Sequence, residues 1–156
     1  MWGMMDTWER CPYDNPLMPD SRIHVEPAGL TPLERGVMGY LLKGDDPTLE
    51  ILRRQFSAAT VVGREYTGVG FFAQFAVDSM SPRIPATQRI TLGDVIVEFP
   101  RLKHGAGFVL FIDQGAINML EGFTYDEAWP DQIADFKLSY WPGENRDLEA
   151  VRKQWQ

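Results

Sequence analysis

One hairpin constrains the fold of this chain more than any other segment. Two runs rich in β-branched and aromatic residues, AGFVLFID and AINMLEGFTYD, flank the short stretch Asp113-Gln114-Gly115. Such runs, joined by a short loop that contains glycine, predict an antiparallel β-hairpin. Apolar residues occupy both faces of each run, so we expect the hairpin to be central in a sheet and covered in part on both sides.

The loop also predicts a register for this hairpin, because Gly115 suits the left-handed position of a three-residue loop. The expected pairs are Ile112 with Ala116, Leu110 with Asn118, Phe108 with Leu120, and Gly107 with Glu121. One face would then carry Val109, Phe111, Ile117 and Met119, and the other Phe108, Leu110, Ile112 and Leu120. A slip of one residue would exchange the two faces of one strand relative to the other. We expect Phe111 to be a core residue.

Two helices are predicted before the strands. In TPLE, Thr31 is placed as an N-cap and Glu34 completes a capping box. In KGDDP, Asp46 caps a second helix, and a proline opens each helix at its first position. Together they form a helical hairpin with a short linker. Arg53 falls off the apolar stripe of the second helix, so we expect it to face solvent.

Further strands complete the expected sheet. A hairpin about Gly68 is predicted from ATVVGREYT and VGFFAQFAVD. One bent strand or two short ones are predicted from RITLGDVIVEFP, and a last strand is predicted from DFKLSYWP. ENRDLEAVRKQW predicts a terminal helix capped by Asn145. Helices followed by strands with short turns indicate an α+β protein, with an N-terminal αα-hairpin packed on a mainly antiparallel sheet of about five to six strands.

Length and composition predict a single domain over residues 1–156. Residues 1–30 hold four prolines and little periodicity, so we expect an irregular N-terminal arm, pinned by Trp2, Trp8 or Tyr13. Cys11 is the single cysteine, which excludes an internal disulfide framework and favours the cytoplasm. No histidine lies near it in sequence, so a passive thiol is expected. No run reaches the roughly 18 apolar residues of a membrane span, and the N-terminus lacks the features of a signal peptide.

The charge distribution predicts the kind of partner. A net charge of −7 argues against nucleic acid, whose phosphates need a basic face, and suits a basic protein partner. The stretch 121–135 has no Lys or Arg and contains five carboxylates: Glu121, Asp126, Glu127, Asp131 and Asp135. With Tyr125 and Trp129 beside them, these residues fit an acidic rim around an aromatic anchor. Ordinary solvated loops are the alternative.

Two carboxylates inside predicted strands allow a catalytic alternative. Glu121 shares its strand face with apolar residues, and an apolar setting raises a carboxyl pKa toward the range of a general acid or base. If Glu65 shares that face, the pair would line a cleft with Tyr125, and the chain would be a small-molecule binder or a hydrolase-like enzyme that uses the two carboxylates for acid–base chemistry. A solvated or salt-bridged carboxylate at a strand end is the simpler interpretation of Glu121.

Motifs that bind metals or cofactors are missing from the sequence. His24 and His104 are the only histidines, and no spacing typical of a zinc site includes them. The glycine pairs at 68–70 and 105–107 lead into strands rather than helix N-termini, so they are not phosphate loops. No GxSxG motif is present. We therefore expect no metal and no cofactor, and a non-enzymatic protein rather than an enzyme.

Two segments of the chain resemble small bacterial proteins that share a TGVGFF…G…LEG(F/Y)(T/S)Y…WP pattern. The segments are GREYTGVGFF and GFVLFIDQGAINMLEGFTYDEAWP. The resemblance covers roughly residues 30–142. That group has no assigned activity, so it implies no catalytic residues for this chain. Some similar small acidic α+β proteins serve as immunity partners of bacterial toxins. The resemblance thus implies a bacterial protein with a binding or immunity-type role.

Overall fold

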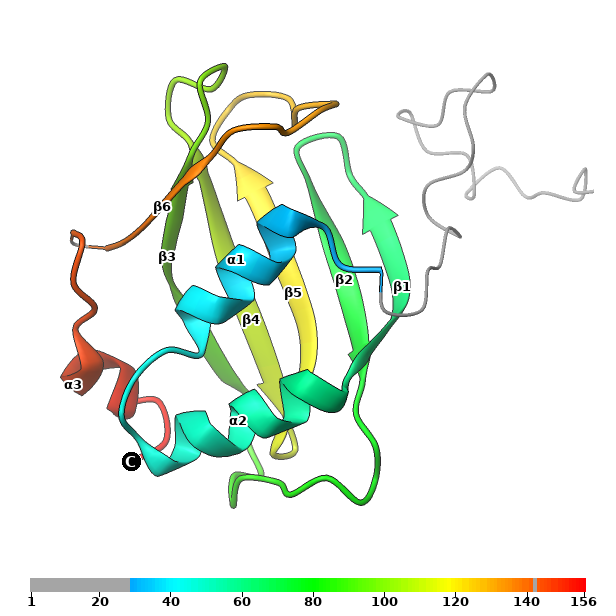
Figure 1. Ribbon diagram of the computed structural model, residues 1–156, viewed down its shortest axis with the longest axis vertical. Helices are drawn as coiled ribbons and strands as arrows, with labels where there is room; N and C mark the ends of the chain where they lie inside the picture. Colours follow the sequence, from blue (N-terminus) through cyan, green and yellow to red (C-terminus); the bar gives the residue numbers. More distant parts are fainter. Residues whose placement is uncertain (1–28, 142) are drawn as a thin grey trace, which may run out of the picture.

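The computed structural model describes residues 29–141 and 143–156 (Figure 1). The elements in chain order are α1 (Pro32–Leu41), α2 (Pro47–Ala58), β1 (Thr60–Tyr66), β2 (Gly70–Ala76), β3 (Ile90–Glu98), β4 (Ala106–Asp113), β5 (Ala116–Thr124), β6 (Lys137–Tyr140) and α3 (Leu148–Arg152). The predicted α+β class, with a helical hairpin packed on an antiparallel sheet, is confirmed. The predicted N-terminal arm lies outside the described residues, apart from Gly29 and Leu30.

The first two helices begin where their capping residues predict. The Thr31 hydroxyl accepts a hydrogen bond from the Glu34 N–H at 3.1 Å, and the Glu34 carboxylate accepts one from the Thr31 N–H at 2.9 Å. Asp46 accepts from the N–H groups at the start of α2. These bonds satisfy donors that have no partner within the helix. The third cap was predicted wrongly, because α3 is capped by Asp147 and not by Asn145.

The sheet has six strands in the order β1-β2-β5-β4-β3-β6, and every neighbouring pair is antiparallel. The β4–β5 hairpin occupies the middle of the sheet, as its apolar composition predicts. β3 is one continuous strand with a bulge between Leu92 and Val95. β1 and β6 form the two edges.

The register of the central hairpin differs from the predicted one. Gln114 and Gly115 lie at φ angles of 52° and 81°, and a two-residue turn of this kind needs positive φ at both positions. Asp113 therefore pairs with Ala116, and a bulge near Asn118 shifts the rest of the strand. The other pairs are Ile112 with Ile117, Phe111 with Met119, Leu110 with Leu120, Val109 with Glu121, Phe108 with Gly122 and Gly107 with Phe123.

Helices α1 and α2 lie over one face of the sheet, which we call the inner face (Figure 1). Its buried strand residues include Phe71, Ala73, Phe75, Leu92, Val95, Val97, Phe108, Leu110, Ile112, Ile117 and Leu120. They pack with Leu33, Val37, Met38, Leu41, Leu49 and Leu52 of the helices. Because of the bulge, Ile117 lies on this face and not with Val109, Phe111 and Met119, so its predicted placement was wrong. Phe111 does share a face with Val109 and Met119, but that face is the opposite one and Phe111 is half-buried there, so its assignment to the core was wrong.

A buried amide ties α2 to the central hairpin. Gln55 has no exposed surface, and its Nε2 donates to the carbonyls of Pro82 and Gly115, each at 2.8 Å. Its Oε1 accepts from the Ile117 N–H at 2.9 Å. Every polar atom of this side chain is therefore bonded, as a buried amide requires. The contact fixes the turn end of the hairpin against the helix.

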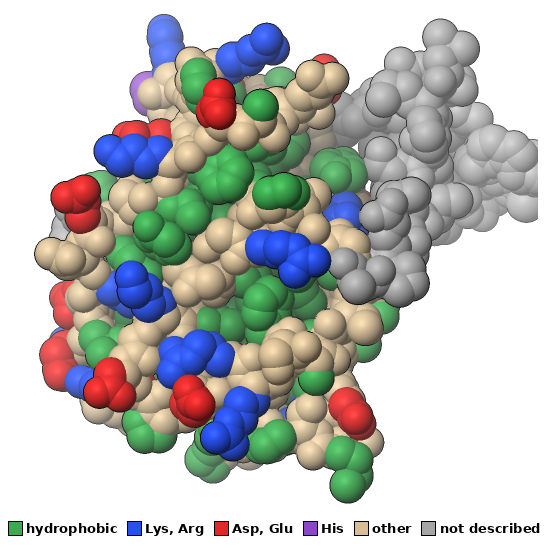
Figure 2. Space-filling model, in the orientation of Figure 1, with side chains coloured by type: hydrophobic (Ala, Val, Ile, Leu, Met, Phe, Trp, Pro, Cys, Tyr) green, Lys and Arg blue, Asp and Glu red, His purple; other side chains and the backbone are tan. Residues whose placement is uncertain are grey.

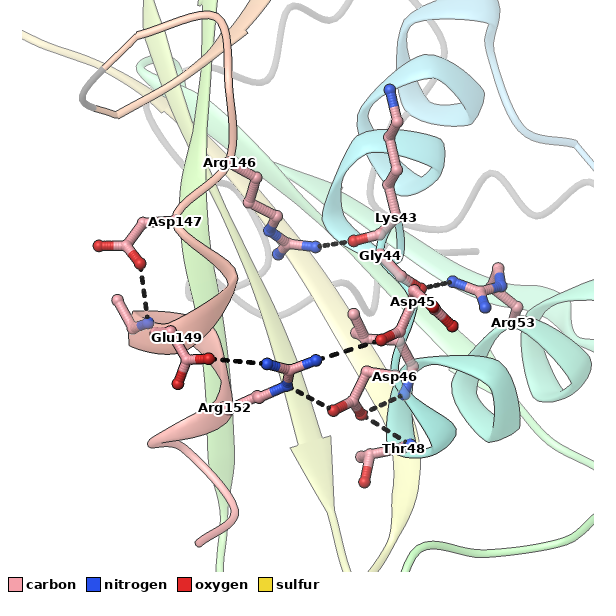
Figure 3. Close-up of polar contacts among 12 residues, drawn as sticks. Lys43, Gly44, Asp45, Asp46, Thr48, Arg53, Arg146, Asp147, Glu149 and Arg152 are labelled. Carbon is pink, nitrogen blue, oxygen red and sulfur yellow. Dashed lines mark hydrogen bonds and ion pairs between the residues drawn. The ribbon is translucent and has the colours of Figure 1, made fainter.

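The C-terminal segment is held on the α1–α2 connection by two arginines (Figure 3). Arg146 forms a two-pronged ion pair with Asp94 of β3, at 2.8 and 2.9 Å, and donates to the Lys43 carbonyl at 2.7 Å. Arg152 of α3 bonds Asp46, the cap of α2, at 3.0 Å. Residues at opposite ends of the described chain thus meet at one corner of the fold.

Arg53 has a structural role that its sequence position did not reveal. Its Nη1 donates to the carbonyls of Leu42 and Gly44, at 2.5 and 3.0 Å, just after the end of α1 (Figure 3 shows the Gly44 contact). Carbonyls at a helix C-terminus lack partners within the helix, so the guanidinium satisfies groups that would otherwise need water. The expectation that Arg53 only faces solvent was wrong.

Candidate functional site

The second face of the sheet, which we call the outer face, is apolar but only half-buried. Its apolar side chains are Phe72, Ile96, Val109, Phe111, Met119 and Phe123. Along β4 and β5, half-buried outer residues alternate with buried inner ones. In the described part of the chain, α1 and α2 both lie on the inner side and no helix covers the outer face (Figure 1). The hairpin was predicted to be covered in part on both sides, and in the described residues helices cover only its inner side.

Glu65 and Glu121 share the outer face. Glu65 of β1 pairs with Phe72 of β2, which in turn pairs with Glu121 of β5, and Glu121 pairs with Val109 of β4. The four side chains form a row across four neighbouring strands. Adjacent strands are about 4.8 Å apart, so the two carboxylate residues are separated by about 10 Å with an aromatic ring between them. The sequence left open whether they share a face, and the strand order brings them together.

The two carboxylates of this row differ in their surroundings. Glu121 is half-buried between Phe72 and Val109, with Met119 and Phe123 on either side along its own strand. This burial raises the pKa of the Glu121 carboxyl, because removal from water disfavours the charged form. Glu65 is exposed at the edge strand. The neighbour predicted for Glu121 was Gly107, which instead lies opposite Phe123.

Aromatic rings close the end of the outer face nearest Gly107. A Cβ at Gly107 would lie 2.6 Å from the Tyr125 hydroxyl oxygen and 2.7 Å from Phe123 Cζ, so only glycine fits beneath these rings. Tyr125 packs edge-to-face on Phe123 at 5.5 Å and keeps 43% of its surface exposed. Tyr125 is thus an accessible aromatic residue at the margin of the outer face.

A cation occupies the opposite end of the outer face. The Arg89 guanidinium lies over the Phe111 ring, 5.2 Å from its centre, and 3.7 Å from the Asp113 carboxylate. Such a position is favourable for a cation because the face of an aromatic ring carries negative charge. The chain therefore places a positive charge of its own over Phe111, at the turn end of the hairpin.

The acidic stretch 121–135 is divided between different surroundings. The Glu127 carboxylate accepts hydrogen bonds from the backbone N–H groups of Lys103 and His104, at 3.0 and 3.3 Å. It therefore holds the loop after β3 in place. Asp126 is exposed at a φ of 65°, a left-handed backbone conformation. Of these acids, Glu121 alone belongs to the row on the outer face.

Trp129 points toward the inner side of the sheet. Its ring packs edge-on against Phe71 at 5.2 Å and against Phe99 and Phe108 at 6.1 Å. The backbone N–H of Trp129 donates to the Gly68 carbonyl at 2.8 Å. The sequence suggested an aromatic anchor for a partner. The structure instead uses the indole to fasten the segment after β5 onto the core.

A buried ion pair lies on the inner side of β1, next to Glu65 in sequence. Arg64 Nη2 donates to the Glu34 carboxylate of α1 at 2.7 Å and to the Gly29 carbonyl at 3.1 Å, and both charged side chains are at least nine-tenths buried. Burial raises the pKa of Glu34, and hydrogen bonds from Thr31 and the charge of Arg64 oppose that rise. The pair joins α1 to β1, so we assign it a structural role.

The helix-bearing side has no patch of a single charge. Figure 2 shows acidic and basic side chains interspersed there around hydrophobic side chains. Among residues 29–141 and 143–156, no group of three or more His, Cys, Asp or Glu side chains is arranged to hold a metal ion. No helix in those ranges is long and apolar enough to cross a membrane.

Comparison with family models, with curated proteins and with solved structures finds no match to this chain. The function is therefore inferred from the molecule itself. Of the surfaces described, the outer face departs most from an ordinary solvated surface, because it combines contiguous half-buried apolar side chains with a half-buried carboxylate.

Proposed function

We propose that this chain is a non-enzymatic protein-binding protein of the immunity type, and that its outer face is the binding surface. The contrast between the two faces carries the proposal. Apolar residues of β2, β4 and β5 are buried on the inner face and half-buried on the outer face. Contiguous apolar side chains at a surface, with polar groups around them, mark interaction sites in proteins.

The charges support a basic protein as the partner. The net charge is −7, and the outer face presents Glu65 and Glu121, with Asp126 exposed beyond Tyr125. Negative charge steers a basic partner during association and contributes specificity more than affinity. The resemblance to small bacterial proteins and the single cysteine support a bacterial cytoplasmic setting for this role, as part of the same proposal.

Hydrolase-like chemistry is the second candidate, and one observation favours it. Glu65 and Glu121 lie on the same face, and the raised pKa of Glu121 suits a general acid. Such chemistry needs a cleft that encloses both carboxylates and excludes water around a substrate. The two proposals differ in what Glu121→Gln alone should do. A hydrolase would lose turnover completely, whereas a binding surface would lose part of its affinity.

The test is capture of a partner from the native cell on the immobilised full-length chain. The wild type is compared with the double substitution Glu65→Gln/Glu121→Gln, with Phe72→Ala, and with Glu144→Gln as a control at an exposed acid before α3. We expect the wild type and the control to retain the same protein and both outer-face variants to lose most of it. Binding should also weaken as salt screens the exposed charges over about 8 Å. A partner retained equally by all four chains would disprove the proposal.

A further inference from the structure

The row on the outer face has a defined spacing of charge and apolar surface. In strand order it runs from Glu65 to Phe72, Glu121 and Val109. Each step is one inter-strand distance of about 4.8 Å. A partner that matches this row therefore needs two cations about 10 Å apart, an apolar group between them, and a second apolar group about 5 Å beyond one cation.

An α-helix lying across the strands has this spacing. Residues i and i+7 of a helix are about 10.5 Å apart along the axis and lie on one face, because each residue rises 1.5 Å and 3.6 residues complete a turn. Residues i+3 and i+4 fall between them on that face, and i+10 and i+11 follow about 5 Å later. Consecutive side chains of an extended strand point to opposite sides, so a strand laid along the row matches it less well.

The inner face shows how this sheet accommodates helices. Both α1 and α2 cross the strands obliquely and bury apolar side chains against them (Figure 1). The outer face offers apolar side chains on the same strands, with Phe72, Val109 and Met119 around Glu121. The cation at the turn end, Arg89, already lies over Phe111, so a partner's positive charge is directed to the row rather than to that end.

We propose that the outer face binds an amphipathic helix of the partner protein, with basic residues at i and i+7 and apolar residues at i+3 or i+4 and at i+10 or i+11. The basic residues pair with Glu65 and Glu121, and the apolar residues cover Phe72 and Val109. Arginine suits the position over half-buried Glu121, because a guanidinium is weakly hydrated and bonds a carboxylate through two N–H groups. This inference rests on the proposed function and names the chemistry of its partner.

Two synthetic helical peptides test the match with the full-length chain. The first carries arginines at i and i+7 with leucines at i+3, i+4, i+10 and i+11 of an otherwise alanine and glutamine sequence. The second has the same composition, but its second arginine stands at i+9, on the opposite side of the helix. Dissociation constants are measured by fluorescence anisotropy. We expect the first peptide to bind at least about tenfold more tightly, and equal binding of the two, or none, would overturn the inference.

Substitutions in the chain locate the contact. Glu121→Gln should weaken binding of the first peptide about tenfold and Glu65→Gln about two- to fivefold, because the more buried charge loses more when its partner is removed. Phe72→Ala should also weaken binding, and Glu144→Gln should leave it unchanged. Equal affinity for wild type and the Glu65 and Glu121 variants would overturn the inference. A partner captured from the cell by the outer face, without peptide binding, would leave the proposed function standing and this inference rejected.

Two other occupants give different results. If a second copy of the chain covers the outer face, sedimentation will show a dimer that Met119→Lys dissociates. If residues 1–28 cover it, a spin label on Cys11, the single cysteine, will broaden the NMR methyl signals of Met119 and Val109 more strongly than those of inner-face Leu110. Either result would overturn the proposal of a partner helix. A monomer whose outer-face signals stay sharp until peptide is added supports it.

Discussion

The two faces of the sheet differ in how deeply they bury their apolar residues. On the inner face, Phe108 is 1% exposed and Leu110 and Leu120 are fully buried beneath α1 and α2. On the outer face, Phe111 and Met119 belong to the same strands and have similar chemistry, yet they are half-buried. Alternation along a strand therefore reports which residues share a face, but which face receives the helices depends on the rest of the fold.

Polar groups differ between the faces in the same way. On the inner side, Gln55 and the Arg64–Glu34 pair are buried and bonded to named partners. On the outer face, Glu121 is half-buried among apolar side chains, and burial raises its pKa. A buried polar group with its partners stabilises one arrangement of the fold, whereas a half-buried carboxylate among apolar groups has free energy to gain from a partner cation.

The largest expected effect comes from truncating one aromatic side chain on each face of the sheet and comparing the losses of stability. Phe108→Ala should lower the free energy of unfolding by about 3–5 kcal/mol, because it leaves a cavity in the closed core. Phe111→Ala should cost only about 1–2 kcal/mol, since the ring is half-buried beneath Arg89. Urea unfolding measures both changes. Equal losses would mean that the outer face is as closely packed as the inner one.

A smaller effect compares two neighbouring residues of β1 that point to opposite faces. Arg64→Gln should lower stability by about 3 kcal/mol, because it leaves the Glu34 carboxylate buried without its cation. Glu65→Gln, at an exposed position, should change stability by less than about 0.5 kcal/mol. Thermal melts of both variants at one pH test the comparison. Similar melting temperatures would show that the buried pair contributes nothing beyond its volume.

The smallest effect concerns Glu121 and depends on pH. Burial raises the pKa of Glu121 in the folded state, so ionisation of this carboxyl lowers the free energy of unfolding. This loss of stability is absent below the unfolded carboxyl pKa of about 4.3, and it grows until the pH exceeds the folded pKa. Glu121→Gln removes the titrating group. The variant should gain stability relative to wild type between pH 3.5 and pH 7, as measured by urea unfolding. A difference in stability that does not change with pH would show that water solvates this carboxylate fully.

Several elements could be predicted from the sequence because their causes are local. The capping box at Thr31–Glu34 and the Asp46 cap act within one turn of helix, and both helices start where these residues place them. The register of the central hairpin could not be predicted. It depends on Gln114 adopting a φ of 52°, which lets the turn close with two residues instead of three. A glutamine has no strong preference for that conformation, so tertiary contacts at Gly115 decide it.

The candidate site, too, could be predicted from the sequence only in part. The sequence identified Glu65, Glu121 and Tyr125 as candidates, and the structure places them on or beside the outer face. It also suggested Trp129 as an exposed anchor, but the indole packs against Phe71 and Phe108, which are more than 20 residues away in the chain. An aromatic residue in an acidic loop has the same local signature whether it packs inward or binds a partner.

By itself, the sequence determined the starts of the first two helices, the central position of the hairpin and the alternation of apolar residues along most of each strand. These features follow from hydrogen bonds and side-chain directions within a few residues. Only the tertiary structure decided that Glu65 and Glu121 share a face. That outcome requires β2 to lie between β1 and β5, which are about 50 residues apart in the chain. It also decided which apolar face the helices cover, because burial there depends on packing between elements that no local pattern specifies.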